Sequence, residues 1–426
     1  MNRIRMAKIV AASAAVALAA ACSAPVPGML KADGVDRVSV DATAYAAELR
    51  AFRNSALGLG QALLADGGNG TGGNVVSSPG SLLVALAMLR AGASGETAAE
   101  LDAVLGLPRD GRNEAMNALL ASLAKFDGDP ATVDEDNPPR KPVMHVANGL
   151  FVDREVPTGE AYLNTLARHY GTGVYPVDFS NQGETKPAID AWVDKNTRGR
   201  IKEAPAKYDP RNTFSLLNSV YFAAAWRAPF DPGSTADLPF TTARGEQIDV
   251  PAMHNLLEMK YAEGPGWRGA DLPYAEGFVM RLVLPDSGTD APALFSASGL
   301  RTMADALDAA PLATVQIQLP RWDHRSSFDL RKVLEAAGLQ KTLTTTEDFS
   351  AIQPEMAITQ AAQAANITVA EKGTVAAAVT QINGMVTSAP PRPEQTIDFD
   401  RPFHYQIVHV ETGLPLFMGA VADPRS

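Results

Sequence analysis

Hydrophobic positions in the N-terminal part of the chain recur with the period of an α-helix. Apolar side chains between 49 and 63 follow at spacings of three and four residues, which predicts an amphipathic helix. Ser78 is expected to cap a second helix, with Pro79 at its first position. This helix is apolar on nearly all sides, so we expect it in the core. A third short helix is predicted from 95 and should stop at Gly106.

Strand patterns dominate the rest of the chain. Residues 213–222 and 278–284 are near-continuous apolar runs, which is typical of strands covered on both faces. Apolar residues and glutamines alternate over 315–319, as in a strand with one buried face. Residues 407–421 predict a hairpin. Because strands and helices are mixed without regular alternation, the pattern favours one large α+β domain.

Composition and motifs exclude several classes of function. The chain has 426 residues, and 37 Lys and Arg residues against 48 Asp and Glu residues give a net charge of −11. An acidic protein without a basic run repels nucleic acid, so we expect no nucleic-acid partner. The chain also lacks a nucleophile elbow, a zinc motif and a phosphate-binding loop. Its six histidines are scattered. We therefore expect no enzyme activity, no metal and no other cofactor.

The N-terminus has the pattern of a targeting segment. Basic residues precede an apolar run over 9–21 that is too short to cross a membrane, which predicts a signal peptide over 1–21. The run ends at Cys22, the only cysteine, in a pattern that resembles the lipobox of bacterial lipoproteins. We expect lipidation of Cys22, a flexible tether over 22–41 and attachment to a membrane of the cell envelope. Cleavage after an Ala-x-Ala site with an incidental cysteine, giving a secreted protein, is the alternative.

Six segments in one order resemble the serpin family from about Tyr45 to Pro424. They are the run at Ser78, Pro79 and Ser81, VANGLFV (146–152), TFSLLNSVYFAAAWRAPFD (213–231), LPRWD (319–323), EKGTVAAAVT (371–380) and the C-terminal segment 400–424. The resemblance implies a serpin domain over 42–426 with three β-sheets, eight or nine helices and an exposed reactive-centre loop, as a monomer.

The resemblance also implies a function. Serpins inhibit serine endopeptidases, and some inhibit cysteine endopeptidases, as suicide substrates. The protease cleaves the reactive-centre loop, which then inserts into the central sheet and traps the acylated enzyme. A non-inhibitory serpin that acts as a binding or substrate protein remains the alternative. The implied hinge residues are Glu371, Gly373, Thr374, Ala376, Ala377 and Ala378, and the implied shutter and breach residues are Ser78, Ser81, Asn218, Trp226, Arg321 and Gln363.

The hinge residues suit insertion into a sheet. Gly373 is expected to let the backbone turn, and the small side chains after it offer little resistance to entry. A charged residue at Thr374 would enter the sheet interior unpaired, at a cost of several kcal/mol. Alanines favour helices. Val375 replaces the acidic residue that is usual in the family, and Val379 is bulkier than the usual alanine or serine, which argues for the non-inhibitory alternative. An Arg321–Glu371 ion pair is predicted at the breach.

Two further expectations concern the shutter and the scissile bond. Gln363 stands where many serpins have a histidine, and its amide can bond to Asn218 or Ser81. The usual loop length of the family, counted from Gly373, implies a scissile bond at Thr387-Ser388, with Met385-Val386 and Val386-Thr387 as alternatives. Between 373 and 391 there is no Lys or Arg. Trypsin-like targets are therefore disfavoured, and elastase- or subtilisin-like endopeptidases are the expected partners.

Overall fold

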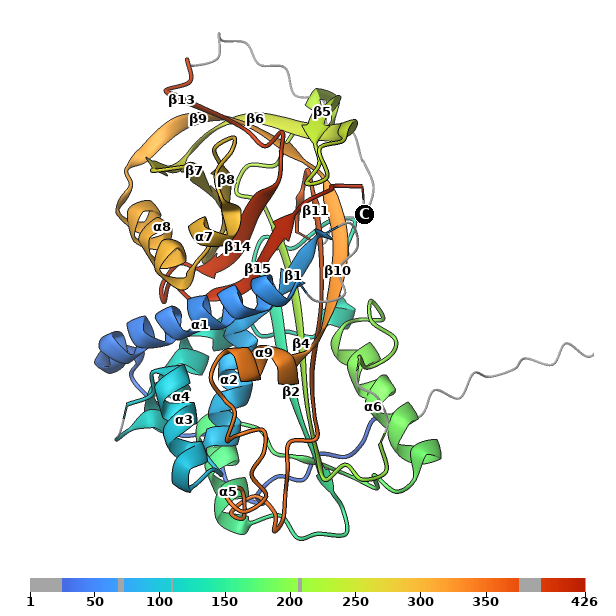
Figure 1. Ribbon diagram of the computed structural model, residues 1–426. Helices are drawn as coiled ribbons and strands as arrows, with labels where there is room; N and C mark the ends of the chain where they lie inside the picture. Colours follow the sequence, from blue (N-terminus) through green and yellow to red (C-terminus); the bar gives the residue numbers. More distant parts are fainter. Residues whose placement is uncertain (1–24, 68–72, 109, 206–208, 375–391, 426) are drawn as a thin grey trace, which may run out of the picture.

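The computed structural model describes residues 25–67, 73–108, 110–205, 209–374 and 392–425. Two sheets and their covering helices make up this part of the chain (Figure 1). The helices are α1 (Ala46–Asp66), α2 (Pro79–Arg90), α3 (Gly95–Leu105), α4 (Arg112–Leu123), α5 (Glu160–Thr165), α6 (Gln182–Asn196), α7 (Ala291–Leu294), α8 (Ala297–Ala309) and α9 (Leu330–Ala336).

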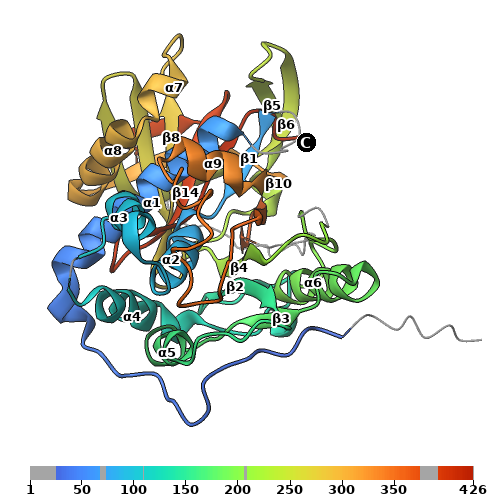
Figure 2. The same cartoon turned by 60° about the horizontal axis from the view of Figure 1, so that its bottom comes forward.

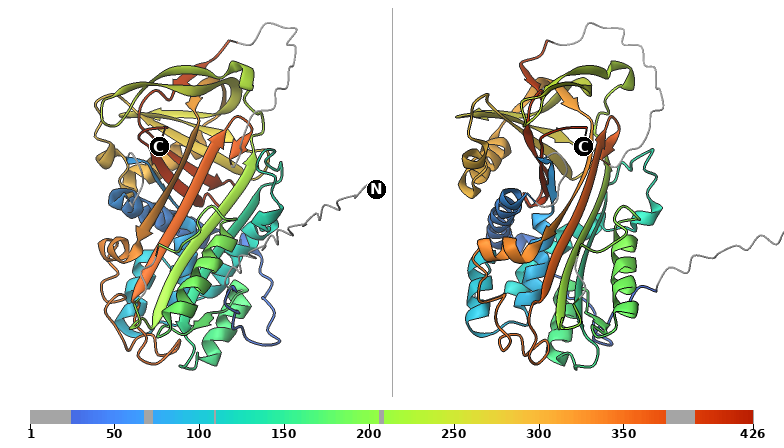
Figure 3. Two further views of the ribbon diagram at one scale, coloured as in Figure 1. Left: turned by 90° about the vertical axis from the view of Figure 1, so that its right-hand side faces the viewer. Right: turned by 45° about the vertical axis from the view of Figure 1, so that its right-hand side comes forward.

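A six-stranded sheet runs along the long axis of the molecule, with α6 on one face and α2 on the other (Figure 3). Its order is β10 (Trp322–Asp329), β11 (Gln360–Ala370), β12 (Gly373–Thr374), β4 (Phe214–Ala225), β2 (Val143–Asp153) and β3 (Tyr175–Val177). Every residue of β4 is buried, as its continuous apolar run predicts. Trp192 of α6 and Leu217 of β4 belong to the cluster that covers one face.

A nine-stranded sheet curls around the upper end of the molecule in Figure 1. Its strands are β1 (Val75–Ser77), β5 (Ala236–Thr241), β6 (Gln247–Gly264), β7 (Trp267–Pro273), β8 (Phe278–Pro285), β9 (Leu312–Pro320), β13 (Gln395–Asp398), β14 (Phe403–His409) and β15 (Pro415–Val421). The long strand β6 pairs with β5 over 247–252, with β9 over 252–260 and with β7 over 260–264. Counted as two halves that share β6, the fold has three sheets. The nine α-helices of the described residues complete the expected α+β architecture.

The central pair of the long sheet, β4 and β11, is joined at one end only. There the two strands are parallel neighbours, from Gln360 opposite Ser215 to Ala364 opposite Ser219. At the other end the two-residue strand β12 lies between them and pairs with both. The sheet is therefore already partly open at the end where β12 sits.

The segment 22–41 was predicted to be a flexible tether, but its described part, from residue 25 on, makes contacts with the rest of the domain. Leu30 and Val174 exchange backbone hydrogen bonds of 2.7 and 3.0 Å, and Arg37 Nε donates to Asn117 Oδ1 at 2.7 Å. Figure 2 shows this segment passing beside α4 and α5. The sequence pattern did not predict these contacts, because backbone hydrogen bonds and a single arginine side chain leave no apolar periodicity in the sequence.

The start of α2 also differs from the prediction. Ser78 stands directly before the helix, with Pro79 at its first position, but its hydroxyl makes no cap. Instead, Ser78 Oγ donates to the Leu416 carbonyl at 2.6 Å. The side chain thus ties α2 to β15. No helix in the described part of the chain has the length and apolar character that crossing a bilayer requires.

Candidate functional site

The hinge begins inside the long sheet, which differs from the expectation of a loop that enters only after cleavage. In β12, Gly373 lies opposite Ala225 and Thr374 opposite Ala224, while on the other edge Thr374 lies opposite Val369. Thr374 is 1% exposed. Two residues of an additional strand therefore already occupy the slot between β4 and β11.

Glycine is required at 373 for two reasons, of which the sequence suggested one. We expected Gly373 to give the backbone freedom to turn, and its φ of 158° is one that L side chains rarely adopt. A Cβ atom on this residue would lie 2.1 Å from the Ala224 carbonyl oxygen, and it would meet the backbone of β4 rather than a movable side chain. Gly373 thus allows the close approach of two backbones.

Among the described residues, the buried hydroxyl of Thr374 has one partner, the hydroxyl of Tyr274, at 2.5 Å. The Tyr274 ring stacks on Trp226 with a centroid distance of 4.4 Å and an interplanar angle of 20°. Burial raises the pKa of the Tyr274 phenol well above its usual value, so the group stays neutral and can donate. Trp226 in turn donates its indole N–H to the Ala370 carbonyl at 2.9 Å. Tyr274 thus contacts the hinge at Thr374, and Trp226 contacts Ala370, the residue directly before Glu371.

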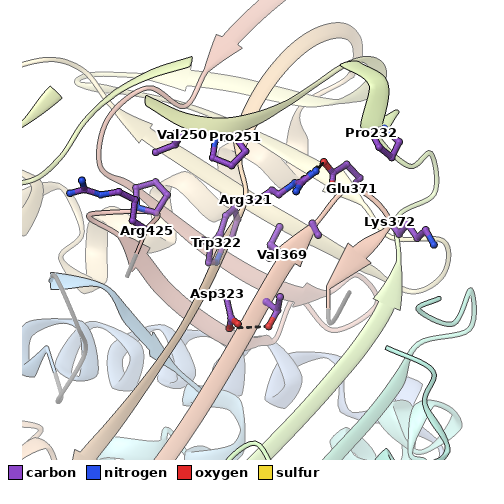
Figure 4. A pocket seen from close by; sticks show the side chains of 13 residues that line it. Pro232, Val250, Pro251, Arg321, Trp322, Asp323, Val369, Glu371, Lys372 and Arg425 are labelled. Carbon is purple, nitrogen blue, oxygen red and sulfur yellow. Dashed lines mark hydrogen bonds and ion pairs between the residues drawn. The ribbon is translucent and has the colours of Figure 1, made fainter. Parts of the chain in front are cut away.

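Glu371 is the electrostatic anchor of the hinge. Arg321 Nε donates to Glu371 Oε1 at 2.7 Å, and Arg321 Nη2 contacts the same oxygen (Figure 4). The hydroxyl of Thr235 also donates to this oxygen, at 2.6 Å. The predicted Arg321–Glu371 ion pair is therefore present. Because the Glu371 side chain is only 6% exposed, its charge depends on these partners.

A double-mutant cycle measures what this ion pair contributes. Arg321→Ala, Glu371→Gln and the double variant are expected to show a coupling free energy of about 1–2 kcal/mol in unfolding experiments. Arg321 is one-third exposed, which weakens the pair, while burial of Glu371 strengthens it. Strictly additive single effects would show that the two side chains act independently. Arg268 and Asp286, whose closest approach is 3.5 Å and which are more than 40% exposed, form a control pair with little expected coupling.

A cavity of about 340 Å³ lies beside the ion pair. Figure 4 shows Pro251 and Val250 on one side of it and Trp322 and Val369 on the other, with Arg321 reaching across to Glu371. The described residues contain no group of three or more His, Cys, Asp or Glu side chains that could hold a metal ion.

A second polar cluster lies deeper, where α2 meets the middle of the long sheet. Gln363 Nε2 donates to Asn218 Oδ1 at 2.7 Å and to the Ser78 carbonyl at 3.0 Å, while its Oε1 accepts from the Ser78 N–H at 2.8 Å. Asn218 Nδ2 contacts Ser81 Oγ and donates to Asn148 Oδ1. The bond expected between Gln363 and Asn218 is present. We call Ser78, Ser81, Asn148, Asn218 and Gln363 the shutter cluster.

The shutter cluster links the strands that insertion must separate. Gln363 belongs to β11 and Asn218 to β4, and the two residues are opposite each other in the register. Gln363 is completely buried and Asn218 is 3% exposed, so every bond that opening breaks must be replaced. None of the five side chains titrates near neutral pH, so the cluster contains no pH-sensitive group.

Sequence reasoning missed three residues of these sites. Asn148, inside an otherwise apolar strand, was a signal that we did not use, because a buried amide needs partners. Tyr274 and Thr235 carry no sequence signal of their own. Other predicted residues lie outside the described part of the chain: Cys22, Ala376, Ala377, Ala378, Thr387 and Ser388.

Comparison with known proteins identifies the family to which this chain belongs. The family model described as serpin (serine protease inhibitor) matches residues 53–424. The chain therefore belongs to the serpin family, whose members are generally protease inhibitors rather than enzymes.

Individual relatives agree with this assignment. An uncharacterized serpin-like protein of Thermococcus kodakarensis is 32% identical over 366 residues, which cover 84% of this chain and 82% of the relative. Alpha-1-antiproteinase of Rattus norvegicus is 27% identical over 365 residues, covering 82% and 84%. The native state of the thermophilic serpin tengpin has the same fold, with a TM-score of 0.78, 22% identity and coverage of 93% and 100%. A thyroxine-binding globulin in complex with thyroxine matches with a TM-score of 0.73, 24% identity and coverage of 88% and 99%.

Proposed function

We propose that the protein inhibits serine endopeptidases by trapping them as acyl-enzymes while its cleaved loop enters the long sheet. The observation that supports this most directly is β12, because Gly373 and Thr374 already pair with both β4 and β11. A sheet that accepts the first two residues of a new strand offers the next ones the same two edges. Each added residue gains ladder hydrogen bonds on both sides.

The register of β12 also answers the objection raised by Val375 and Val379. Successive side chains of a strand point to opposite faces. A cleaved loop that continued this register would direct Ala376 and Ala378 to the buried face of Thr374. Val375 and Val379 would be directed to the opposite face, where α6 lies further along the sheet. The small residues thus fall where the core leaves least room.

Target class and location belong to the same proposal. The absence of Lys and Arg between 373 and 391 favours proteases with small apolar pockets of the elastase or subtilisin type over trypsin. The Thr387-Ser388 bond remains the proposed cleavage site. We further propose that the protein is exported and lipid-anchored through Cys22 to an envelope membrane. Loss of detergent-phase partitioning in Cys22→Ser would support the anchor, and unchanged partitioning would contradict it.

The test of inhibition is a gel experiment. The purified serpin domain is incubated with elastase, subtilisin and trypsin at equal molarity, and SDS gels are run over time. A covalent band at the summed mass with elastase or subtilisin is the expected result. Clipped protein without such a band, for all three enzymes, would reject inhibition of these classes. That outcome would favour the non-inhibitory alternative, a serpin that serves as a binding or substrate protein.

A further inference from the structure

Insertion of the loop has a defined starting point in the uncut molecule. Thr374 is almost fully buried, and its hydroxyl would be costly to keep there without a hydrogen-bond partner. Tyr274 supplies that partner at 2.5 Å from outside the strand pair, because it follows β7 of the other sheet. A side chain that directly follows a strand of the nine-stranded sheet therefore contacts the first residues of the new strand.

Tyr274 is fixed by contacts of its own, so it would not move with the hinge if β12 left the long sheet. Its ring is stacked on Trp226 and packed edge-on against Phe222, with a centroid distance of 5.2 Å. Its backbone N–H is bonded to the Phe278 carbonyl at 3.1 Å. Departure of Thr374 would thus leave the phenol hydroxyl buried without its partner. Because both the Tyr274 and the Thr374 hydroxyl are buried, their hydrogen bond favours the docked state.

We propose that Tyr274 is a positioning residue that holds Thr374 as the first residue of the inserting strand, so that insertion starts from a formed nucleus. The proposal rests on the inhibitory function proposed above. After cleavage, the acyl-enzyme has two fates. Either the loop inserts and the ester survives, or water adds to the ester and releases the loop carboxylate and the free serine hydroxyl.

The docked nucleus favours the first fate. Fixing the first residues of a strand costs conformational entropy before any ladder bonds repay it. In this molecule two residues are fixed beforehand. Removal of the Tyr274 hydroxyl should slow the start of insertion and leave acylation alone, because its partner Thr374 precedes the proposed scissile bond by 13 positions in the sequence. More acyl-enzyme would then be hydrolysed, and more inhibitor molecules would be consumed per protease trapped.

The first test is hydrogen exchange, which does not require inhibition. The peptide that contains residues 371–374 should exchange slowly in the uncut wild-type protein. Tyr274→Phe should speed this exchange by about 2- to 10-fold, the equivalent of one net hydrogen bond. Thr374→Val should do the same, and the double variant should add little to either. Wild-type exchange at the rate of an unprotected peptide would overturn the proposal.

The second test is the stoichiometry of inhibition. Tyr274→Phe should raise the number of inhibitor molecules consumed per trapped protease by about 2- to 10-fold, by the same hydrogen-bond estimate, with an unchanged association rate. Tyr162→Phe is the matched control. Tyr162 lies in α5, at the far end of the molecule, and its buried hydroxyl donates to the carbonyl of Met88 in α2 at 3.1 Å. Equal stoichiometries in both variants would overturn the positioning role. A wild-type protein that traps no protease would reject the proposed function, while hydrogen exchange would still test the docking.

Discussion

Replacing Thr374 with arginine is expected to convert the protein from an inhibitor into a substrate. The Thr374 side chain is 1% exposed and faces the ring hydroxyl of Tyr274. An arginine there would have to bury a guanidinium group, and the buried carboxylate of Glu371, three residues earlier in the chain, is already paired with Arg321. The unpaired charge costs several kcal/mol, which exceeds the gain from the first ladder bonds.

The measurement is the ratio of trapped to clipped protein after reaction with the target protease. Thr374→Arg should reduce the trapped fraction at least 10-fold, since about 1.4 kcal/mol corresponds to a factor of ten. Thr396→Arg is the matched control, because Thr396 is exposed on β13 after the loop and adds the same charge at no burial cost. Full trapping by Thr374→Arg would contradict insertion through this slot.

The sequence was informative wherever a single segment or a short polar residue determined the structure. The run 213–222 predicted β4 because a strand covered on both faces is apolar over nearly its whole length. The Arg321–Glu371 pair and the Gln363–Asn218 bond followed from the resemblance together with the charge and amide chemistry of the four residues. These features depend on residue type more than on exact geometry.

The missed features depend on where distant segments meet. Tyr274 acts on Thr374 from a strand end a hundred positions earlier in the chain, and nothing in its neighbourhood of sequence marks it. The docking of Leu30 against Val174 uses backbone groups that every residue carries. The second reason for Gly373 was missed for the same cause, because the oxygen of Ala224 that excludes a side chain belongs to another strand. Local patterns cannot carry such information.

The shutter cluster and β12 have opposite effects on the long sheet of the uncut protein. β12 holds the slot open at one end, whereas Gln363 and Asn218 keep β4 and β11 paired at the other. Complete insertion must break the parallel pairing of 360–364 with 215–219. The new strand would replace each lost bond and add a second edge of its own. The uncut state is therefore a partly opened sheet whose remaining hydrogen-bonding capacity is unused.

Cutting the loop should consequently make the protein more stable. β4 offers 12 residues along the slot, of which Ala224 and Ala225 already pair with β12, so about ten more residues can insert, each with a net stabilisation of about 0.5–1.5 kcal/mol. The sum is on the order of 10 kcal/mol, which for a domain of this size corresponds to a rise in Tm of roughly 10 °C or more. A metalloprotease is the suitable reagent, because it cleaves with a metal-activated water and forms no acyl-enzyme.

The nicked and uncut proteins are compared by calorimetry or by circular dichroism during heating. Thr374→Arg, nicked in the same loop, serves as the control and should show little or no rise, because its strand cannot enter. This pairing separates insertion from any general effect of chain cleavage, which by itself adds conformational freedom and lowers stability. An unchanged Tm of the nicked wild-type protein would mean that the loop is no lower in free energy inside the sheet than outside. Trapping of a protease would then have no driving force.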